Sequence, residues 1–102
     1  MLQWSSRLYV GVKAEAFKDQ IRTVVEKGLA FPEAYLITLS ANEAEQLDII
    51  ETKQLIFWKV HRTLPKIVGI ALTRKEALDV VLQMALDIYE ETGDCDFRAY
   101  FS

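Results

Sequence analysis

Few side chains in the sequence have types and spacings that support chemistry. The most suggestive are Arg74 and Lys75, two cations that follow an apolar segment and begin a predicted helix. The dipole at a helix N-terminus disfavours cations and favours a bound anion. Ligands of open parallel sheets bind beyond the carboxyl ends of the strands, where Lys13 and Ser40 are also expected. We therefore consider Lys13, Ser40, Arg74 and Lys75 a candidate anion-binding site; the alternative is that Arg74 and Lys75 are simply solvated.

The single histidine does not point to catalysis. His61 lies close to Lys59 and Arg62, and these positive charges disfavour the imidazolium form. No carboxylate between Thr52 and Lys75 is available to orient the ring. We therefore expect a surface histidine, unless a carboxylate from another element approaches it in space.

The single cysteine is also expected to be structural, and buried or half-buried. Cys95 lies between Asp94 and Asp96, whose charges oppose formation of the nucleophilic thiolate. The spacing of these two acids with Glu90 and Glu91 matches no EF-hand loop. The sequence contains no glycine-rich nucleotide-binding motif. We predict no catalytic residues, no metal site and no cofactor, and consider a non-enzymatic protein the better interpretation.

Charge is distributed in two blocks of opposite sign. Residues 52–75 carry six cations and no acid, and residues 76–96 carry seven acids and no base. Such blocks favour a contact between two copies of the chain or with a charged partner. The alternative is that they match each other within one chain. The net charge of −3 gives no general attraction to nucleic acid or to an anionic membrane, so neither is an expected partner.

The predicted helix over residues 74–91 is apolar around most of its circumference, which requires deep burial or a second partner. A predicted edge strand over residues 95–101 offers free backbone groups for pairing with a symmetry mate. These features predict a homodimer that acts through protein contacts, with an interface at Leu82, Tyr89, Tyr100 and Phe101. The alternative function is a small anionic-ligand binding protein or minor enzyme, with its site near Arg74.

Strand and helix signals alternate along the chain. Strands are predicted over residues 7–10, 34–39, 66–72 and 95–101, and helices over 13–27, 43–64 (one helix or two) and 74–91. The order β-α-β-α-β-α-β predicts an α/β domain of three layers or two around a four-stranded, mainly parallel sheet. We expect the strand at 34–39 beside that at 7–10, followed by 66–72 and 95–101. The apolar residues of 66–72 are nearly continuous, which is typical of a strand in the middle of a sheet covered on both sides. Thr73 and Glu76 have the spacing of a capping box, so Thr73 is expected to cap the helix that follows it, and Gly93 is expected to end that helix.

The length of 102 residues predicts one domain spanning residues 1–102. The first residues lack the basic and apolar regions of a signal peptide, and no apolar run approaches the roughly 20 residues needed to cross a bilayer. The sequence therefore predicts a cytoplasmic protein without a membrane partner.

Overall fold

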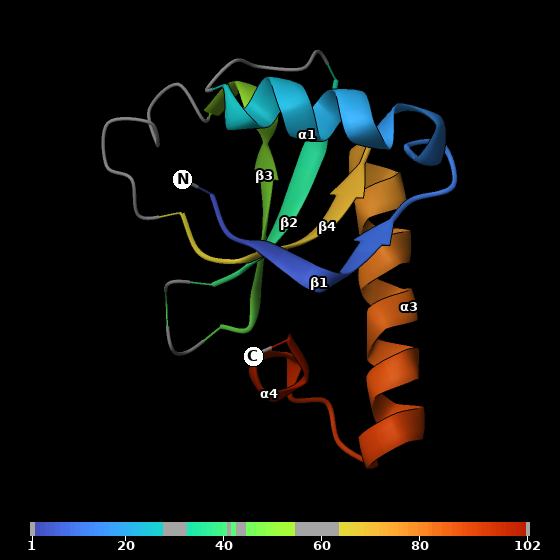
Figure 1. Ribbon diagram of the computed structural model, residues 1–102. Coiled ribbons are helices and arrows are strands. Elements are labelled where there is room, and N and C mark those ends of the chain that lie inside the picture. The colour runs from blue at the N-terminus through green and yellow to red at the C-terminus, as the bar shows by residue number, and fades with distance from the viewer. Residues whose placement is uncertain (1, 28–32, 41, 43–44, 55–63, 102) are drawn as a thin grey trace.

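A computed structural model describes residues 2–27, 33–40, 42, 45–54 and 64–101. A four-stranded sheet lies between α1 on one side and α3 and α4 on the other (Figure 1). The strands are β1 (Trp4–Val10), β2 (Tyr35–Leu39), β3 (Leu47–Glu51) and β4 (Ile67–Ala71). The α-helices are α1 (Lys18–Glu26), α3 (Arg74–Thr92) and α4 (Phe97–Phe101), with short 3₁₀ turns at Glu15–Phe17 and Thr52–Gln54.

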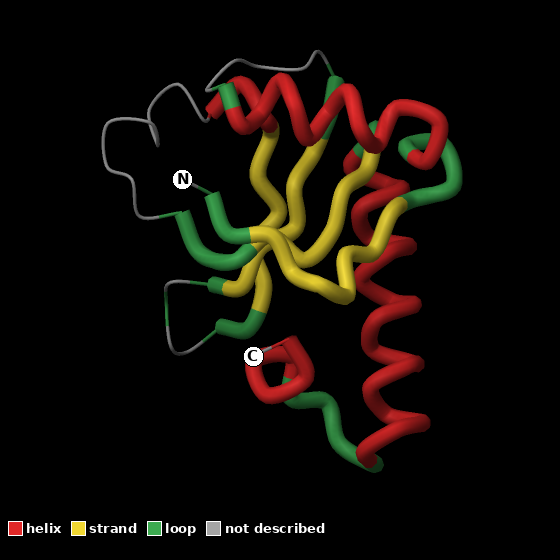
Figure 2. The backbone as a smooth tube through the Cα atoms, viewed as in Figure 1, coloured by secondary structure: helices red, strands yellow, loops and turns green. Residues whose placement is uncertain are grey.

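The strands follow the spatial order β1-β4-β2-β3 (Figure 2). Only β1 and β4 run parallel, with Val10 opposite Ile70. β2 is antiparallel both to β4 and to β3, with which it forms a hairpin. The prediction of a mainly parallel sheet is therefore wrong, and so is the predicted strand order. The strand predicted at 66–72, which is β4, lies between β1 and β2. The predicted order instead placed the strand at 7–10 between the other two.

β4 is central, as its composition predicts. All five of its residues are buried. A strand with neighbours on both edges and helices on both faces has no solvated side, so a continuous apolar run is stable there. Ile67 and Ile70 face α1, whereas Val68 and Ala71 face α3. Residue 68 is bulged relative to β2, since Ile37 pairs with Gly69 and Thr38 with Ile67.

Each face of the sheet is closed by its own helix layer. On one face, Ile21 and Val25 of α1 are buried against strand residues that include Leu36 and Ile70. On the opposite face, α3 and α4 contribute the buried side chains Ala77, Val80, Met84, Ile88, Phe97 and Phe101. The structure is therefore three-layered, which was one of the two predicted layer arrangements.

The predicted helix over residues 43–64 is wrong in its described part. Residues Leu47–Glu51 form β3 instead. Leu47 and Ile49 point to the α3 side, and Ile50 points to the α1 side. Ile49 and Ile50 are adjacent β-branched residues, which are more favourable in an edge strand than in a helix. Residues 43–44 and 55–63 lie outside the described residues, so the rest of this prediction is untested.

The predicted last strand is also wrong, because Phe97–Phe101 form helix α4. Phe97 and Phe101 are both buried. Alternation of Phe97, Ala99 and Phe101 indicates a strand, but Phe97 and Phe101 are also spaced i, i+4, one turn of a helix. In a segment of five residues both patterns fit, and the packing of the two rings under the sheet selects the helix.

Candidate functional site

Helix α3 organises both surfaces that are candidates for function. Its start is capped by Thr73, whose hydroxyl accepts a hydrogen bond from the Glu76 N–H at 3.0 Å. Its end is Gly93, which has a φ of 74° in the left-handed region that glycine tolerates best. Both predictions about the ends of this helix are confirmed. The caps fix the register of the helix, and so the direction in which each side chain points.

The buried carboxylate of Glu76 joins three segments of the chain. Oε1 accepts the Leu72 N–H at 2.8 Å, and Oε2 accepts the Lys13 N–H at 2.6 Å. Gly11 makes this approach possible, because a Cβ at this position would lie 2.4 Å from the Glu76 side chain. The carboxylate therefore occupies two backbone N–H groups that could otherwise donate to an external anion at this end of the sheet.

The structure brings together only part of the predicted anion site. Lys13 and Lys75 line the same cavity, whereas Arg74 is exposed outside it. Ser40 follows β2, which is antiparallel to β4, so it lies at the opposite end of the sheet from Thr73. There it is buried, and its hydroxyl accepts the Asn42 N–H at 3.0 Å.

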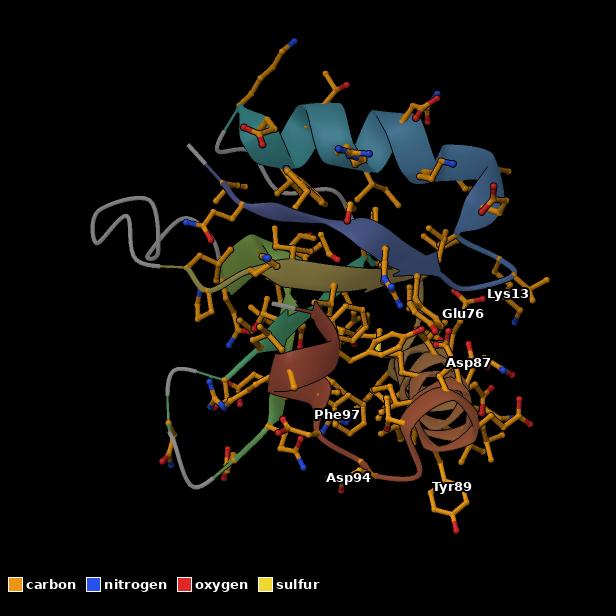
Figure 3. The ribbon with its side chains drawn as sticks, turned by 60° about the horizontal axis from the view of Figure 1, so that its bottom comes forward. Lys13, Glu76, Asp87, Tyr89, Asp94 and Phe97 are labelled. Atoms are coloured by element: carbon orange, nitrogen blue, oxygen red, sulfur yellow. The ribbon has the colours of Figure 1, made fainter. Side chains whose placement is uncertain are left out.

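The cavity has a volume of about 460 Å³ and lies between the end of β1 and the first turns of α3. Figure 3 shows Lys13 and Glu76 next to each other at this end of β1, with Asp87 further along α3. The cavity walls come from residues 9–13 and from the starting half of α3. Its polar lining consists of Tyr9, Lys13, Thr73, Lys75, Glu76, Asp79 and Gln83, and its apolar lining of Val10, Val12 and Val80.

A short hydrogen-bond chain orients one wall of this cavity. The Tyr9 hydroxyl donates to Asp87 Oδ2 at 2.6 Å, and Gln83 Nε2 donates to Asp87 Oδ1 at 2.8 Å. Burial, aided by the hydrogen bond to Asp87, raises the pKa of the Tyr9 phenol above its ordinary value. Tyr9 therefore remains a neutral donor. Its ring also packs edge-on against Phe101, with 5.9 Å between the centroids.

The outer face of α3 carries an apolar stripe, formed by Leu78, Leu82, Leu86 and Tyr89. Their exposed fractions are 52%, 60%, 51% and 62%. Spacings of four, four and three residues align them along one side of the helix. This group, called the outer stripe below, faces away from the sheet, which the helix contacts through Ala77, Val80, Met84 and Ile88.

The four residues predicted for a dimer interface therefore lie in different parts of the structure. Leu82 and Tyr89 lie in the outer stripe. Phe101 is only 3% exposed and belongs to the core. Tyr100 is half-buried: its hydroxyl donates to Glu91, and its ring lies under the Arg7 guanidinium at 4.6 Å. Leu78 and Leu86 were missed as interface residues, although their i, i+4 spacing around Leu82 was a readable signal.

The other chemical candidates remain without support. Cys95 is exposed, so the prediction that it is buried or half-buried is wrong. His61 lies outside the described residues, so the prediction of a surface histidine is untested. In the part of the chain that the structure describes, no group of three histidine, cysteine or acidic residues is placed to hold a metal ion. Over the same residues, no ion pair joins the basic block to the acidic block.

Comparison with protein-family models, with curated proteins and with solved structures finds no match. No helix within the described ranges is both long enough and apolar enough to cross a membrane. Within the described residues, α3 carries two surfaces that are candidates for function, the cavity at its start and the outer stripe.

Proposed function

We propose that the protein is a homodimer whose interface is the outer stripe of α3, packed antiparallel on the same helix of a second copy, and that it functions through protein contacts. The observation that carries this proposal is the charge at the two ends of the stripe. Arg74 and Lys75 flank its start, and Glu90, Glu91 and Asp94 lie at its end. The last turn of α3 contains no basic residue.

This distribution is unfavourable for an isolated helix. The dipole of a helix favours acids in its first turn and bases in its last. Glu76 satisfies this rule, but Arg74, Lys75, Glu90 and Glu91 oppose it. An antiparallel second copy makes this charge distribution favourable, because the acidic end of one helix then lies beside the basic start of the other. The two helix dipoles are also antiparallel in this arrangement.

The spacing of the stripe supports the same arrangement. Leu78 and Tyr89 are 11 residues apart, about 16 Å along the helix. A two-fold axis near residue 83 places Leu78 opposite the partner's Tyr89. Lys75 lies on the side of α3 that borders the cavity, and there the same axis places it beside the partner's Glu90. A two-fold contact forms each of these pairs twice.

The expected association is weak. Fully burying a leucine contributes about 1.5–3 kcal/mol, so each half-exposed side chain of the stripe contributes about 1 kcal/mol. Eight such side chains in two copies contribute about 8 kcal/mol, within the range of about 4–15 kcal/mol that association costs. At the lower end of that range about 4 kcal/mol of net binding free energy is left, so we expect a dissociation constant on the order of 1 mM.

Exchanging the charges of Lys75 and Glu90 tests whether the chain dimerises and whether the two α3 helices are antiparallel. Lys75→Glu alone and Glu90→Lys alone each create two repulsive contacts in a homodimer, whereas a mixture of the two variants restores both attractions. We expect each variant to self-associate about tenfold more weakly than the original chain, and their mixture to associate at least as well as it does. Sedimentation equilibrium measures the association of each variant and of the mixture. Comparing low with high salt tests the contribution of the charge pairs, because salt screens exposed pairs.

Leu82→Gln provides a test that does not depend on charge. The substitution is exposed, so the fold is retained, but a polar side chain at the centre of the stripe removes the association. The matched control is Phe17→Gln, an exposed apolar residue outside α3. A chain that is monomeric at about 500 μM in both salt conditions contradicts the proposal, and so does a mixture of charge variants that associates no better than either alone.

A further inference from the structure

The cavity at the start of α3 lies where the topology of the sheet creates a crevice. β1 and β4 are adjacent and parallel. The chain leaves β1 for α1 on one face of the sheet, and leaves β4 for α3 on the opposite face. Ligands of open α/β sheets bind outside the carboxyl ends of strands at such a divergence. The volume of about 460 Å³ is within the usual range of ligand cavities, about 300–1,000 Å³.

The lining of the cavity argues against a simple anion. Glu76 already uses the N–H groups of Lys13 and Leu72, so these two backbone donors are not free to bind a phosphate. Two acids, Glu76 and Asp79, line the same cavity as the two lysines. The four formal charges balance, which suits a ligand with no net charge better than an anion or a cation.

The charges that line the cavity are nevertheless separate from each other. Across the described ranges, neither the Lys13 nor the Lys75 ammonium group pairs with a carboxylate, and Asp79 has no cation partner. Lys13, Lys75 and Asp79 are exposed to solvent, so their charges are free to pair with a ligand that itself carries both signs.

The acceptor side of the cavity is preorganised. The Gln83 side-chain N–H donates to Asp87, so Gln83 presents its Oε1 atom as the remaining acceptor. Asp87 is itself fixed by the Tyr9 hydroxyl. Asp79 precedes Gln83 by one turn, which places its carboxylate on the same side of α3. Two acceptors from adjacent turns suit an ammonium group, which has three N–H donors.

We infer that this cavity binds a small zwitterion of the α-amino acid class, with its carboxylate at Lys13 and Lys75, its ammonium group at Asp79 and Gln83, and an apolar side chain against Val80. This goes beyond the proposed dimer and does not require it. Lys75 is near both surfaces, so the tests use Lys13 and Asp79.

The first test compares ligands on the Leu82→Gln chain, so that dimerisation does not contribute. The probes are L-leucine, 4-methylpentanoate, which lacks the ammonium group, and 3-methylbutylamine, which lacks the carboxylate. Titration followed by ¹H–¹⁵N NMR is expected to shift the signals of Lys13, Asp79 and Gln83 with leucine. Each one-charged analogue should bind at least about tenfold more weakly, since each loses one set of charged hydrogen bonds.

The second test compares variants. Asp79→Asn and Lys13→Gln should each weaken leucine binding about tenfold. The matched controls, Asp19→Asn and Lys27→Gln, are exposed positions on α1 and just after it, and should leave binding unchanged. The inference is overturned if leucine at about 20 mM shifts none of the cavity signals, if an analogue binds as well as leucine, or if Asp79→Asn has no effect. None of these outcomes bears on the dimer, which sedimentation of the original chain tests separately.

Discussion

The inner and outer faces of α3 carry similar side chains in different surroundings. Met84 and Ile88 on the inner face are at most 1% exposed, whereas Leu82 and Leu86 on the outer face are exposed by 60% and 51%. Apolar character alone therefore does not distinguish the two faces. The inner residues stabilise the chain as a monomer, and the outer residues retain apolar surface that is available for a second molecule. The same substitution on each face should therefore change different measurements.

The largest effect is expected on the inner face. Met84 is fully buried, and its Cε would lie 2.9 Å from a Cβ at Gly69, so it fills the space that this glycine leaves. Met84→Ala should lower the free energy of unfolding by about 2–5 kcal/mol, from lost burial and the cavity created. Urea denaturation measures this. A loss below about 1 kcal/mol would mean that the two faces differ less than the structure shows.

The next effect is expected at Glu76, which connects the start of α3 with β1. Glu76→Ala leaves the part-buried N–H groups of Leu72 and Lys13 without their acceptor, and should cost about 2–3 kcal/mol. Glu76→Gln keeps one acceptor oxygen and should cost less. Denaturation of both variants against the original chain checks the order. Equal losses would show that the negative charge, and not the two hydrogen bonds, is responsible.

A smaller effect is expected at the cap. Thr73→Ala removes the hydroxyl that accepts the Glu76 N–H and should cost about 0.5–2 kcal/mol, with an unchanged denaturant slope. Thr73→Ser retains the acceptor and serves as the control. A loss of less than a few tenths of a kcal/mol for the alanine variant would reject the cap as a source of stability.

The smallest effect on stability is expected on the outer face. Leu86→Ala should change the unfolding free energy of the dilute monomer by at most about 0.5 kcal/mol, because half of the side chain is already in water. The same variant should self-associate more weakly, as measured by sedimentation equilibrium. A large loss of monomer stability together with unchanged association would reverse the distinction between the two faces.

Local signals in the sequence predicted local structure well. Thr73, Glu76 and Gly93 mark the ends of α3 because caps depend on residues within one turn of each other. The nearly continuous apolar run of β4 identified it as a central strand. The segments 47–51 and 97–101 were misassigned because five residues with two or three apolar positions fit both a strand and a helix. The choice between them depends on packing partners that are distant in the sequence.

The candidate site was predictable only in part, for the same reason. Lys13 and Lys75 were expected together because each follows a strand. Ser40 was included on the assumption that its strand runs parallel to the others, and the antiparallel direction of β2 removes it. Glu76 was recognisable as part of a capping box, but nothing near it in the sequence indicates that its carboxylate reaches the Lys13 N–H, 63 residues earlier.

The parallel pair β1 and β4 has a consequence for the order in which the chain folds. β1 is an edge strand whose single neighbour in the sheet is β4, and Val10 pairs with Ile70, sixty residues later. The β2–β3 hairpin closes a short loop, and such hairpins form within about 1–10 μs. β1 has to wait until a much longer loop closes, which is entropically costly and slows folding. Among the described strands, β1 is therefore expected to pair late, and the cavity at its end is completed only after α3 has begun to form.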